Sequence, residues 1–221
     1  MSAFRLYELD NADGNCTSPF VWRIRFALQH KGLEYESVRV GFLDIPRIGP
    51  GTLKTVPVIE HDGGFFNESW KIAEWLDVGF PETISLFGSP AEYSMAQFFD
   101  KWFGTAVMPP LFRSCVYDLF QRVKPHEQQY FRSTREKMFG ESLESVAARG
   151  HEYLRIARKA LLPMRLALRR APFLGGTHPG YADFIAWGTL AAFSPITRAP
   201  LLAPDDSLNR WVDCGRSILQ F

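Results

Sequence analysis

The sequence predicts an α/β domain in the N-terminal part of the chain and an all-α domain after it. Alternation of apolar and polar residues, which is typical of strands, occurs only before residue 70. A segment rich in proline and glycine, residues 79–90, separates this part from the rest. Beyond it the apolar residues recur at helical spacing. We therefore place the first domain at residues 1–80, a linker at 81–90 and the second domain at 91–221.

The first domain begins with a strand and a helix. Residues 4–9 alternate apolar and polar side chains, as a half-buried strand does. Proline suits the first turn of a helix and glycine suits the position after its last turn, so Pro19 and Gly32 bracket a helix that ends at Lys31. The apolar stripe of this helix comprises Val21, Ile24 and Leu28, with Phe20 and Ala27 beside them.

The rest of the first domain predicts three more strands and a second helix. The expected elements are a strand at 35–40, an irregular segment at 42–53, a strand at 56–60, a tight turn at 62–64 and a returning strand at 65–66. Prolines and glycines in the irregular segment exclude a long helix there. Asn67-Glu68-Ser69 then caps a helix, so the predicted order is β-α-β-β-β-α.

The second domain contains helical patterns only. Its first helix carries an apolar stripe of Met95, Phe98, Phe99, Trp102 and Ala106. Pro163 is expected to break or kink the helix into which it falls. Two further helices are expected at residues 181–192 and 208–219.

Composition and charge exclude several classes of function. The formal net charge is +1, so no overall field directs the chain to nucleic acid or to an anionic membrane. The histidines are scattered without the spacing of a metal site, and we expect no metal. We see neither a signal peptide nor a membrane span. Three cysteines far apart do not indicate a disulfide framework, so we expect a protein of the reducing cytoplasm.

Three features of the first domain suit a single ligand. Ser18-Pro19 stands at a helix N-terminus, where free N–H groups attract an anion. Val56-Pro57 enters a strand, which favours a cis peptide bond that leaves the main chain of Val56 free to pair with a ligand. Glu68-Ser69 starts another helix and can hold an ammonium and a carboxylate. Glutathione combines a weakly acidic thiol, peptide bonds and an α-amino acid head in the matching order.

Ser18 is placed to lower the pKa of a bound thiol. Lowering a thiol pKa from about 8.5 to about 6.5 requires about 2.7 kcal/mol. A helix dipole contributes about 0.3–1 kcal/mol to an anion at its mouth, so a hydrogen bond from the Ser18 hydroxyl to the sulfur is needed as well. Two alternatives stay open: Thr17 or Asn15 assists the thiolate, or the backbone N–H groups suffice and Ser18 is only a cap.

These motifs resemble the glutathione transferase family over nearly the whole chain. TVPVI at 55–59 and NESWKIAEWL at 67–76 resemble its thioredoxin-like domain, and FLGGTHPGYADFIAWG at 173–188 resembles the folding motif of its helical domain. Asp183 occupies the acidic position of that motif, whereas Gly180 replaces the usual capping residue and weakens the capping box. The resemblance implies the two-domain glutathione transferase fold, glutathione as co-substrate and a homodimer.

A narrower resemblance is to the bacterial β-etherases of lignin breakdown and their fungal etherase-like relatives. It is carried by residues 18–36, 99–107 and 205–215. It implies that glutathione thiolate attacks a carbon that bears an aryl ether beside a ketone, and that a phenolate leaves. The resemblance implies that Ser18 contacts the sulfur and that the glutathione-binding residues include Val56, Glu68 and Ser69. Lys54 is a candidate partner for a glutathione carboxylate.

The second domain is expected to supply most of a hydrophobic pocket for an aromatic acceptor. The candidate lining residues are Tyr7, Trp22, Trp102, Phe103, Val107 and Phe112, with Tyr117 and Trp187 in addition. A phenolate leaving group has a pKa of about 10 and needs no general acid.

Three other functions remain open at this stage. A generic detoxifying transferase would use the same site on other electrophiles. Cys16 with a low pKa would make a thiol–disulfide or glutathionyl-transferring enzyme, although Ser18, not Cys16, directly precedes the proline at the helix start. A non-catalytic protein would bind glutathione conjugates or aromatic ligands without turnover.

Overall fold

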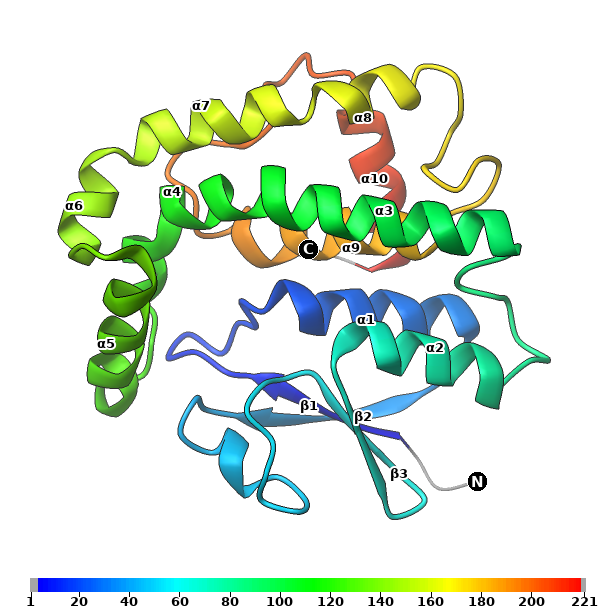
Figure 1. The fold of residues 1–221 in the computed structure, drawn as a ribbon, viewed down its shortest axis with the longest axis horizontal. Coiled ribbons are helices and arrows are strands. Elements are labelled where there is room, and N and C mark those ends of the chain that lie inside the picture. The colour runs from blue at the N-terminus through cyan, green and yellow to red at the C-terminus, as the bar shows by residue number, and fades with distance from the viewer. Residues whose placement is uncertain (1–3, 220–221) are drawn as a thin grey trace.

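The computed structural model describes residues 4–219, which form a small sheet covered on one face by two helices, with a larger helical part beyond them (Figure 1). The first part contains β1 (Phe4–Leu9), α1 (Pro19–Lys31), β2 (Tyr35–Val40), η1 (Ile45–Arg47), β3 (Val58–His61), β4 (Gly64–Asn67) and α2 (Ser69–Gly79). The helical part contains α3 (Pro90–Ala106), α4 (Met108–Phe120), η2 (Pro125–Glu127), α5 (Gln128–Phe139), α6 (Leu143–Ala148), α7 (Gly150–Ala160), α8 (Leu162–Ala167), α9 (Tyr181–Phe193) and α10 (Asn209–Ile218). The predicted fold class is confirmed.

The four strands lie in the order β2-β1-β3-β4. Strands β1 and β2 are parallel, and α1 makes the crossover that a parallel pair requires. Strands β3 and β4 form an antiparallel hairpin, with β3 antiparallel to β1. The strand expected from residue 56 begins at Val58, because Pro57 has no N–H to donate to a neighbouring strand.

Helix α1 begins and ends at the residues that the sequence predicts. The Ser18 side chain accepts a hydrogen bond from the N–H of Val21, and Gly32 takes a left-handed φ of 67° after the last turn. The predicted stripe is wrong at Phe20, whose side chain is 38% exposed. Arg23 is buried instead, with its guanidinium 2.8 Å from the carboxylate of Asp100 in α3. This buried ion pair joins the two parts of the molecule, which apolar periodicity alone does not reveal.

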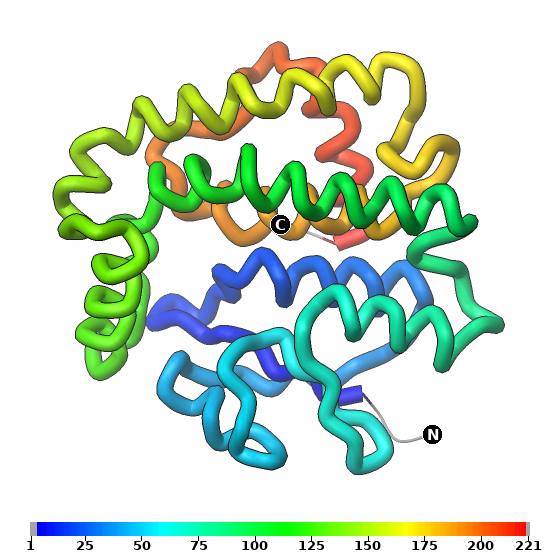
Figure 2. The backbone as a smooth tube through the Cα atoms, in the orientation of Figure 1, coloured from blue at the N-terminus to red at the C-terminus, as the bar shows by residue number. Residues whose placement is uncertain are grey.

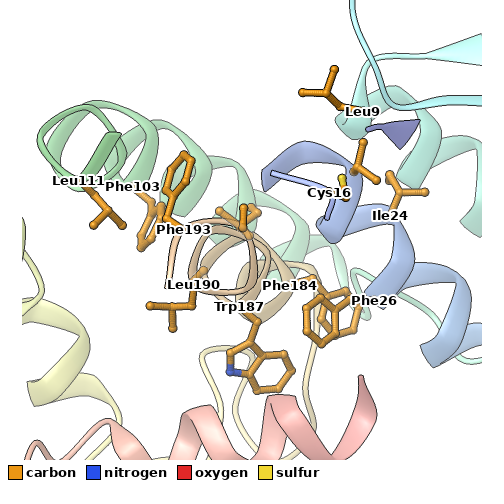
Figure 3. Close-up of a cluster of buried hydrophobic side chains, with 14 of the residues drawn as sticks. Leu9, Cys16, Ile24, Phe26, Phe103, Leu111, Phe184, Trp187, Leu190 and Phe193 are labelled. Carbon is orange, nitrogen blue, oxygen red and sulfur yellow. The ribbon is translucent and has the colours of Figure 1, made fainter. Parts of the chain in front are cut away.

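Helix α9 lies at the centre of the molecule, and all of its residues are buried. A helix that is apolar on every side packs between other elements. Phe26 of α1 lies beside Phe184 of α9, with ring centroids 5.9 Å apart (Figure 3). Gly188 permits a close approach of the two helices: a Cβ there would lie 2.8 Å from the carbonyl oxygen of Pro19 and 2.9 Å from the nitrogen of Arg23. The N-terminal turns of α1 therefore rest directly on α9.

The carboxylate of Asp183 fixes the start of α9. It accepts hydrogen bonds from the N–H of Gly180 at 3.1 Å, the N–H of Leu174 at 3.0 Å and the indole of Trp211 at 2.7 Å. Gly180 has no side chain, so only the acidic half of a capping box is present. The donors from Leu174 and Trp211 satisfy the remaining lone pairs of this buried carboxylate, as a charge without solvent requires.

The buried face of α3 agrees only in part with the predicted one, since Phe99 belongs to both. Ala96, Phe99 and Phe103 are buried, whereas Met95 and Phe98 are 58% and 66% exposed. Both sets recur at helical spacing, so the pattern could not show which of two adjacent apolar faces meets the core.

The helices of the second part also show where Pro163 interrupts the chain and how long the apolar segments are. The break expected near Pro163 is confirmed, because α7 ends at Ala160 and α8 begins at Leu162. Within residues 4–219, no helix has the length and apolar character that crossing a membrane requires.

Replacement of Gly188 by alanine should destabilise the protein. The added methyl group meets main-chain atoms of α1, which cannot rotate away, so we expect a loss of about 1–3 kcal/mol in the free energy of unfolding. Gly104 of α3 is the matched control, since a Cβ there meets nothing within 4 Å and its replacement by alanine should stabilise the helix by up to about 1 kcal/mol. Urea denaturation measures both; equal effects of the two substitutions would contradict the close approach.

Candidate active site

A cavity of about 450 Å³ opens at the N-terminal end of α1, between the two parts of the molecule. The first part contributes the start of α1 and residues 54–56, and the second part contributes residues of α4 and α5. Figure 2 shows α5, in green, at the same end of the molecule as the blue loop that leads into α1. A cavity of this volume accommodates a small organic ligand.

Ser18 lines this cavity and is 8% exposed. Its oxygen accepts the N–H of Val21 at 3.3 Å, and within residues 4–219 no group accepts the proton of its hydroxyl. The first turn of α1 holds no acidic residue, so no side chain of that turn compensates the positive end of the helix dipole. A hydroxyl donor and a partial positive charge thus meet at one wall of the cavity, which is the arrangement that suits an anion.

The segment before β3 lines the same cavity with Lys54, Thr55 and Val56. The Val56–Pro57 peptide bond is cis, as the sequence favours. The hairpin register pairs Val58 with Asn67, and the Asn67 amide donates to the Thr55 hydroxyl at 3.4 Å. This segment is therefore held next to the start of α2.

Glu68 and Ser69 lie at the start of α2, beside the Thr55 segment, and not in the lining of the cavity. Glu68 is exposed, with its carboxylate 2.8 Å from the ammonium of Lys71. Its φ of 69° is one that residues other than glycine rarely adopt. Ser69 is buried, and its carbonyl oxygen accepts the hydroxyl of Tyr181 at 2.7 Å. The start of α2 is thereby tied to α9.

Cys16 is not placed to act as a nucleophile. It is buried and absent from the described lining of the cavity. Burial raises the pKa of its thiol to about 11, which keeps the thiol protonated at neutral pH. The indole of Trp22 donates to the Cys16 carbonyl oxygen at 2.9 Å and fixes the main chain there.

Of the residues predicted to line the acceptor pocket, the structure places one at the cavity and the others elsewhere. Phe112 of α4 lines the cavity, whereas Tyr7, Trp22, Trp102, Phe103, Val107, Tyr117 and Trp187 are absent from its described lining. Phe103 of α3, Trp187 of α9 and Val107, between α3 and α4, are all buried and belong to the core. Tyr7 lies in the sheet and donates its hydroxyl to Glu60 at 2.6 Å. The aromatic richness of the chain therefore serves the core more than the cavity.

Most other residues that line the cavity were not predicted from the sequence. They include Phe20 and Phe42 from the first part and Met108, Tyr130 and Phe139 from α4 and α5. The sequence gives no sign that Phe20 lines the cavity, because it stands beside the buried stripe of α1 and only the structure shows its side chain exposed. Residues of α5 gave no signal either, because the helix carries only one fully buried side chain, Phe131.

The cavity is cationic. Lys54, Arg113 and Arg135 line it, and no aspartate or glutamate occurs among its described lining residues. No group of three or more histidine, cysteine, aspartate or glutamate side chains in the described part of the chain is arranged to hold a metal ion.

Comparisons with known protein families assign both parts of the chain. Residues 17–78 match the family model described as the glutathione S-transferase N-terminal domain, and residues 94–200 match the glutathione S-transferase C-terminal domain. The chain is 29% identical over 191 residues to glutathione transferase GST 23 of Zea mays, with 83% of this chain and 71% of the relative covered.

Solved structures of fungal proteins share the fold. Glutathione transferase GSTFuA2 from Phanerochaete chrysosporium is 23% identical, with a TM-score of 0.87 and 99% of this chain and 98% of that chain covered. The glutathione S-transferase CsGST83044 of Ceriporiopsis subvermispora, solved in complex with glutathione, is 22% identical, with a TM-score of 0.85 and both chains covered completely.

Alkylation of the native protein with iodoacetamide at pH 8 should modify Cys214 well before Cys16. A buried thiol with a pKa of about 11 is thiolate in only about one molecule in a thousand at that pH, whereas Cys214 is only partly buried. Peptide mass spectrometry measures the rates, and modification of both residues after denaturation is the control. Rapid alkylation of Cys16 in the folded protein would restore it as a candidate nucleophile.

Proposed function

Because the chain belongs to the glutathione S-transferase superfamily, we propose that it is a glutathione-dependent transferase in which Ser18 activates the thiol of glutathione. The observation that carries the proposal is the free hydroxyl proton of Ser18, which lines the cavity at the uncompensated positive end of α1. A thiolate sulfur beside this hydroxyl gains a charge-assisted hydrogen bond and the favourable field of the helix.

Other residues around the cavity hold the rest of glutathione. Val56 pairs through its main chain with the peptide part of the ligand, since β3 begins only at Val58 and leaves Val56 outside the strand ladder. Glu68 and Ser69, at the start of α2, bind the γ-glutamyl end, whose ammonium and carboxylate match an acid and a helix N-terminus. Lys54, an exposed cation at the cavity, pairs with the remaining carboxylate.

The electrophile is a hydrophobic aromatic molecule that occupies the part of the cavity lined by α4 and α5. The sulfur attacks an electrophilic carbon of that molecule and forms a thioether as the leaving group departs with the electron pair of the broken bond. The narrower proposal is a β-aryl ether beside a ketone, from which a phenolate leaves. A generic glutathione transferase acting on other aromatic electrophiles fits the same cavity equally well.

A homodimer is also a prediction from the resemblance. Met95 and Phe98 of α3, both more than half exposed, are the apolar side chains that favour it.

The Ser18→Ala substitution should raise the pKa of enzyme-bound glutathione. Loss of a hydrogen bond to a charged sulfur costs about 1.5–3 kcal/mol, which corresponds to a rise of about 1–2 pKa units and a fall in kcat/KM at neutral pH of about tenfold or more. The ultraviolet absorbance of the bound thiolate against pH measures the first. Glutathione consumption with a dinitrohalobenzene, and phenol release from each enantiomer of an α-keto β-aryl ether, measure the second.

Ser89→Ala is the matched control for this experiment. Ser89 also caps a helix and also precedes a proline, but it is absent from the described lining of the cavity. Its replacement should cost a helix cap, about 1 kcal/mol, and leave the pKa of the bound thiol unchanged. If the pKa of bound glutathione is the same in Ser18→Ala as in the wild-type protein, Ser18 does not activate the thiol. Phenol release from one enantiomer alone would support the β-aryl ether, whereas activity with the halobenzene alone would leave the generic transferase.

The Glu68→Gly substitution should weaken glutathione binding without destabilising the fold. Glycine adopts a φ of 69° without strain, and the strain that it relieves is about 1 kcal/mol or more, so we expect an unchanged or raised Tm. The lost carboxylate should raise KM for glutathione by about tenfold. Asp62→Gly, at the other non-glycine residue with positive φ, is the control and should leave KM unchanged. Thermal melting and steady-state kinetics give the two readouts; an unaltered KM for Glu68→Gly would exclude the proposed contact.

A further inference from the structure

The charge of the cavity is unbalanced on its α4–α5 side. Lys54 lies on the side of residues 54–56, where a glutathione carboxylate is proposed, but Arg113 of α4 and Arg135 of α5 line the side left for the electrophile. Neither arginine pairs with a carboxylate within residues 4–219. An apolar electrophile alone would leave both guanidinium groups without an anionic partner.

Arg135 is the more constrained of the two. Its guanidinium lies 4.6 Å from the ring centroid of Phe131 and 5.4 Å from that of Phe42. Its Nη1 donates to the Thr134 hydroxyl at 2.9 Å, whereas its buried Nε has no hydrogen-bond partner among the described residues. Buried donors are nearly always paired in folded proteins, so the guanidinium of Arg135, a residue that lines the cavity, has hydrogen-bonding capacity that the described residues do not fill.

Arg132, on the same helix, shows how an arginine of α5 is paired with carboxylates. Arg132 of α5 has its guanidinium 2.9 Å from Glu136 and 2.8 Å from Glu144. Arg135, one turn further along, has no carboxylate partner among the described residues: it contacts two aromatic faces and the Thr134 hydroxyl, and burial lowers the pKa of its guanidinium from the usual value. Aromatic rings on the faces of a guanidinium leave its N–H groups in the plane of the fork free for an acceptor.

Arg113 supports the same interpretation from α4. Its guanidinium lies 5.0 Å from the ring centroid of Phe139 and 5.9 Å from that of Tyr153, again on aromatic faces. Phe112, the adjacent residue, also lines the cavity. An aromatic ligand with an anionic group could therefore contact apolar surface and two guanidinium groups at once.

We propose that the electrophile that this cavity accepts is an aromatic molecule that carries a carboxylate, and that Arg135, assisted by Arg113, binds this carboxylate. The planar fork of a guanidinium matches a carboxylate in two parallel hydrogen bonds, which a lysine cannot reproduce. The proposal rests on the proposed function, because it names the class of molecule that the glutathione thiolate attacks.

Equilibrium binding tests the carboxylate site without turnover. The probes are 2-naphthoate and 2-naphthamide, which have the same ring system and differ in charge. S-methylglutathione at saturation occupies the glutathione site, so that Lys54 and the start of α1 are not available to the probe. Calorimetry on the full chain should show naphthoate binding about tenfold or more tighter than naphthamide, since each tenfold in Kd corresponds to about 1.4 kcal/mol.

Three variants assign that preference to a residue. Arg135→Met should lose most of the preference and keep only the part that Arg113 provides, while Arg135→Lys should keep more of it because it keeps the charge without the fork. Lys137→Met removes a cation from the exposed face of the same helix and should leave the preference unchanged. Circular dichroism melts of the variants confirm that each is folded.

The results separate this inference from the proposed function. Equal affinity of the wild-type protein for the two probes, failure to bind either one, or a preference that Arg135→Met does not reduce, would overturn the carboxylate site. Glutathione consumption with a neutral dinitrohalobenzene is measured in parallel. Consumption without a naphthoate preference leaves a transferase of neutral electrophiles, whereas naphthoate preference without consumption of glutathione on either the halobenzene or the β-aryl ethers rejects the transferase and keeps the anion site.

Discussion

The contact between α1 and α9 is the constraint on which the arrangement of the site depends. Gly188 lets the main chain of α1 rest against α9 at Pro19 and Arg23, within the first two turns of α1. The ion pair of Arg23 with Asp100 adds α3 to the same junction. Since Ser18 directly precedes these turns, its position at the cavity wall is fixed by the helical part of the molecule as much as by the sheet.

The two parts of the chain supply different chemistry to the cavity. The first part provides main-chain groups and a hydroxyl near the starts of α1 and β3, which in the proposed function recognise a peptide and stabilise a negative sulfur. The helical part provides aromatic faces and guanidinium groups from α4 and α5. Because α9 lies against α1 and Asp183 secures its first turn, the distance between these two sets is set by buried, well-packed elements.

Local chemistry explains why much of the first part could be predicted from sequence. Ser18, Pro19 and Gly32 act through their own backbone preferences, and the cis bond before Pro57 follows from proline itself. The same logic placed Ser18 and Val56 at one ligand, and the structure brings both to one cavity.

Packing between helices explains what could not be predicted. Met95 and Ala96 are both apolar and adjacent, and only the tertiary contact of α3 decides that Ala96 is buried. Phe103 and Trp187, two of the aromatic residues proposed for the acceptor side, belong to the core for the same reason. Arg135 looks like any surface arginine in the sequence, because its lack of a carboxylate partner depends on residues from other elements.

The dipeptide Ser-Pro starts two helices in this chain, with opposite electrostatic outcomes. At α3 the third helical residue is Glu92, whose carboxylate accepts the Ser89 N–H at 2.6 Å, so that terminus neutralises itself. At α1 the equivalent position is Val21, and the terminus carries no anion of its own. The side chain three residues after the serine thus decides whether the positive helix terminus is compensated within the protein or left uncompensated, and a search for the dipeptide alone would treat the two as the same.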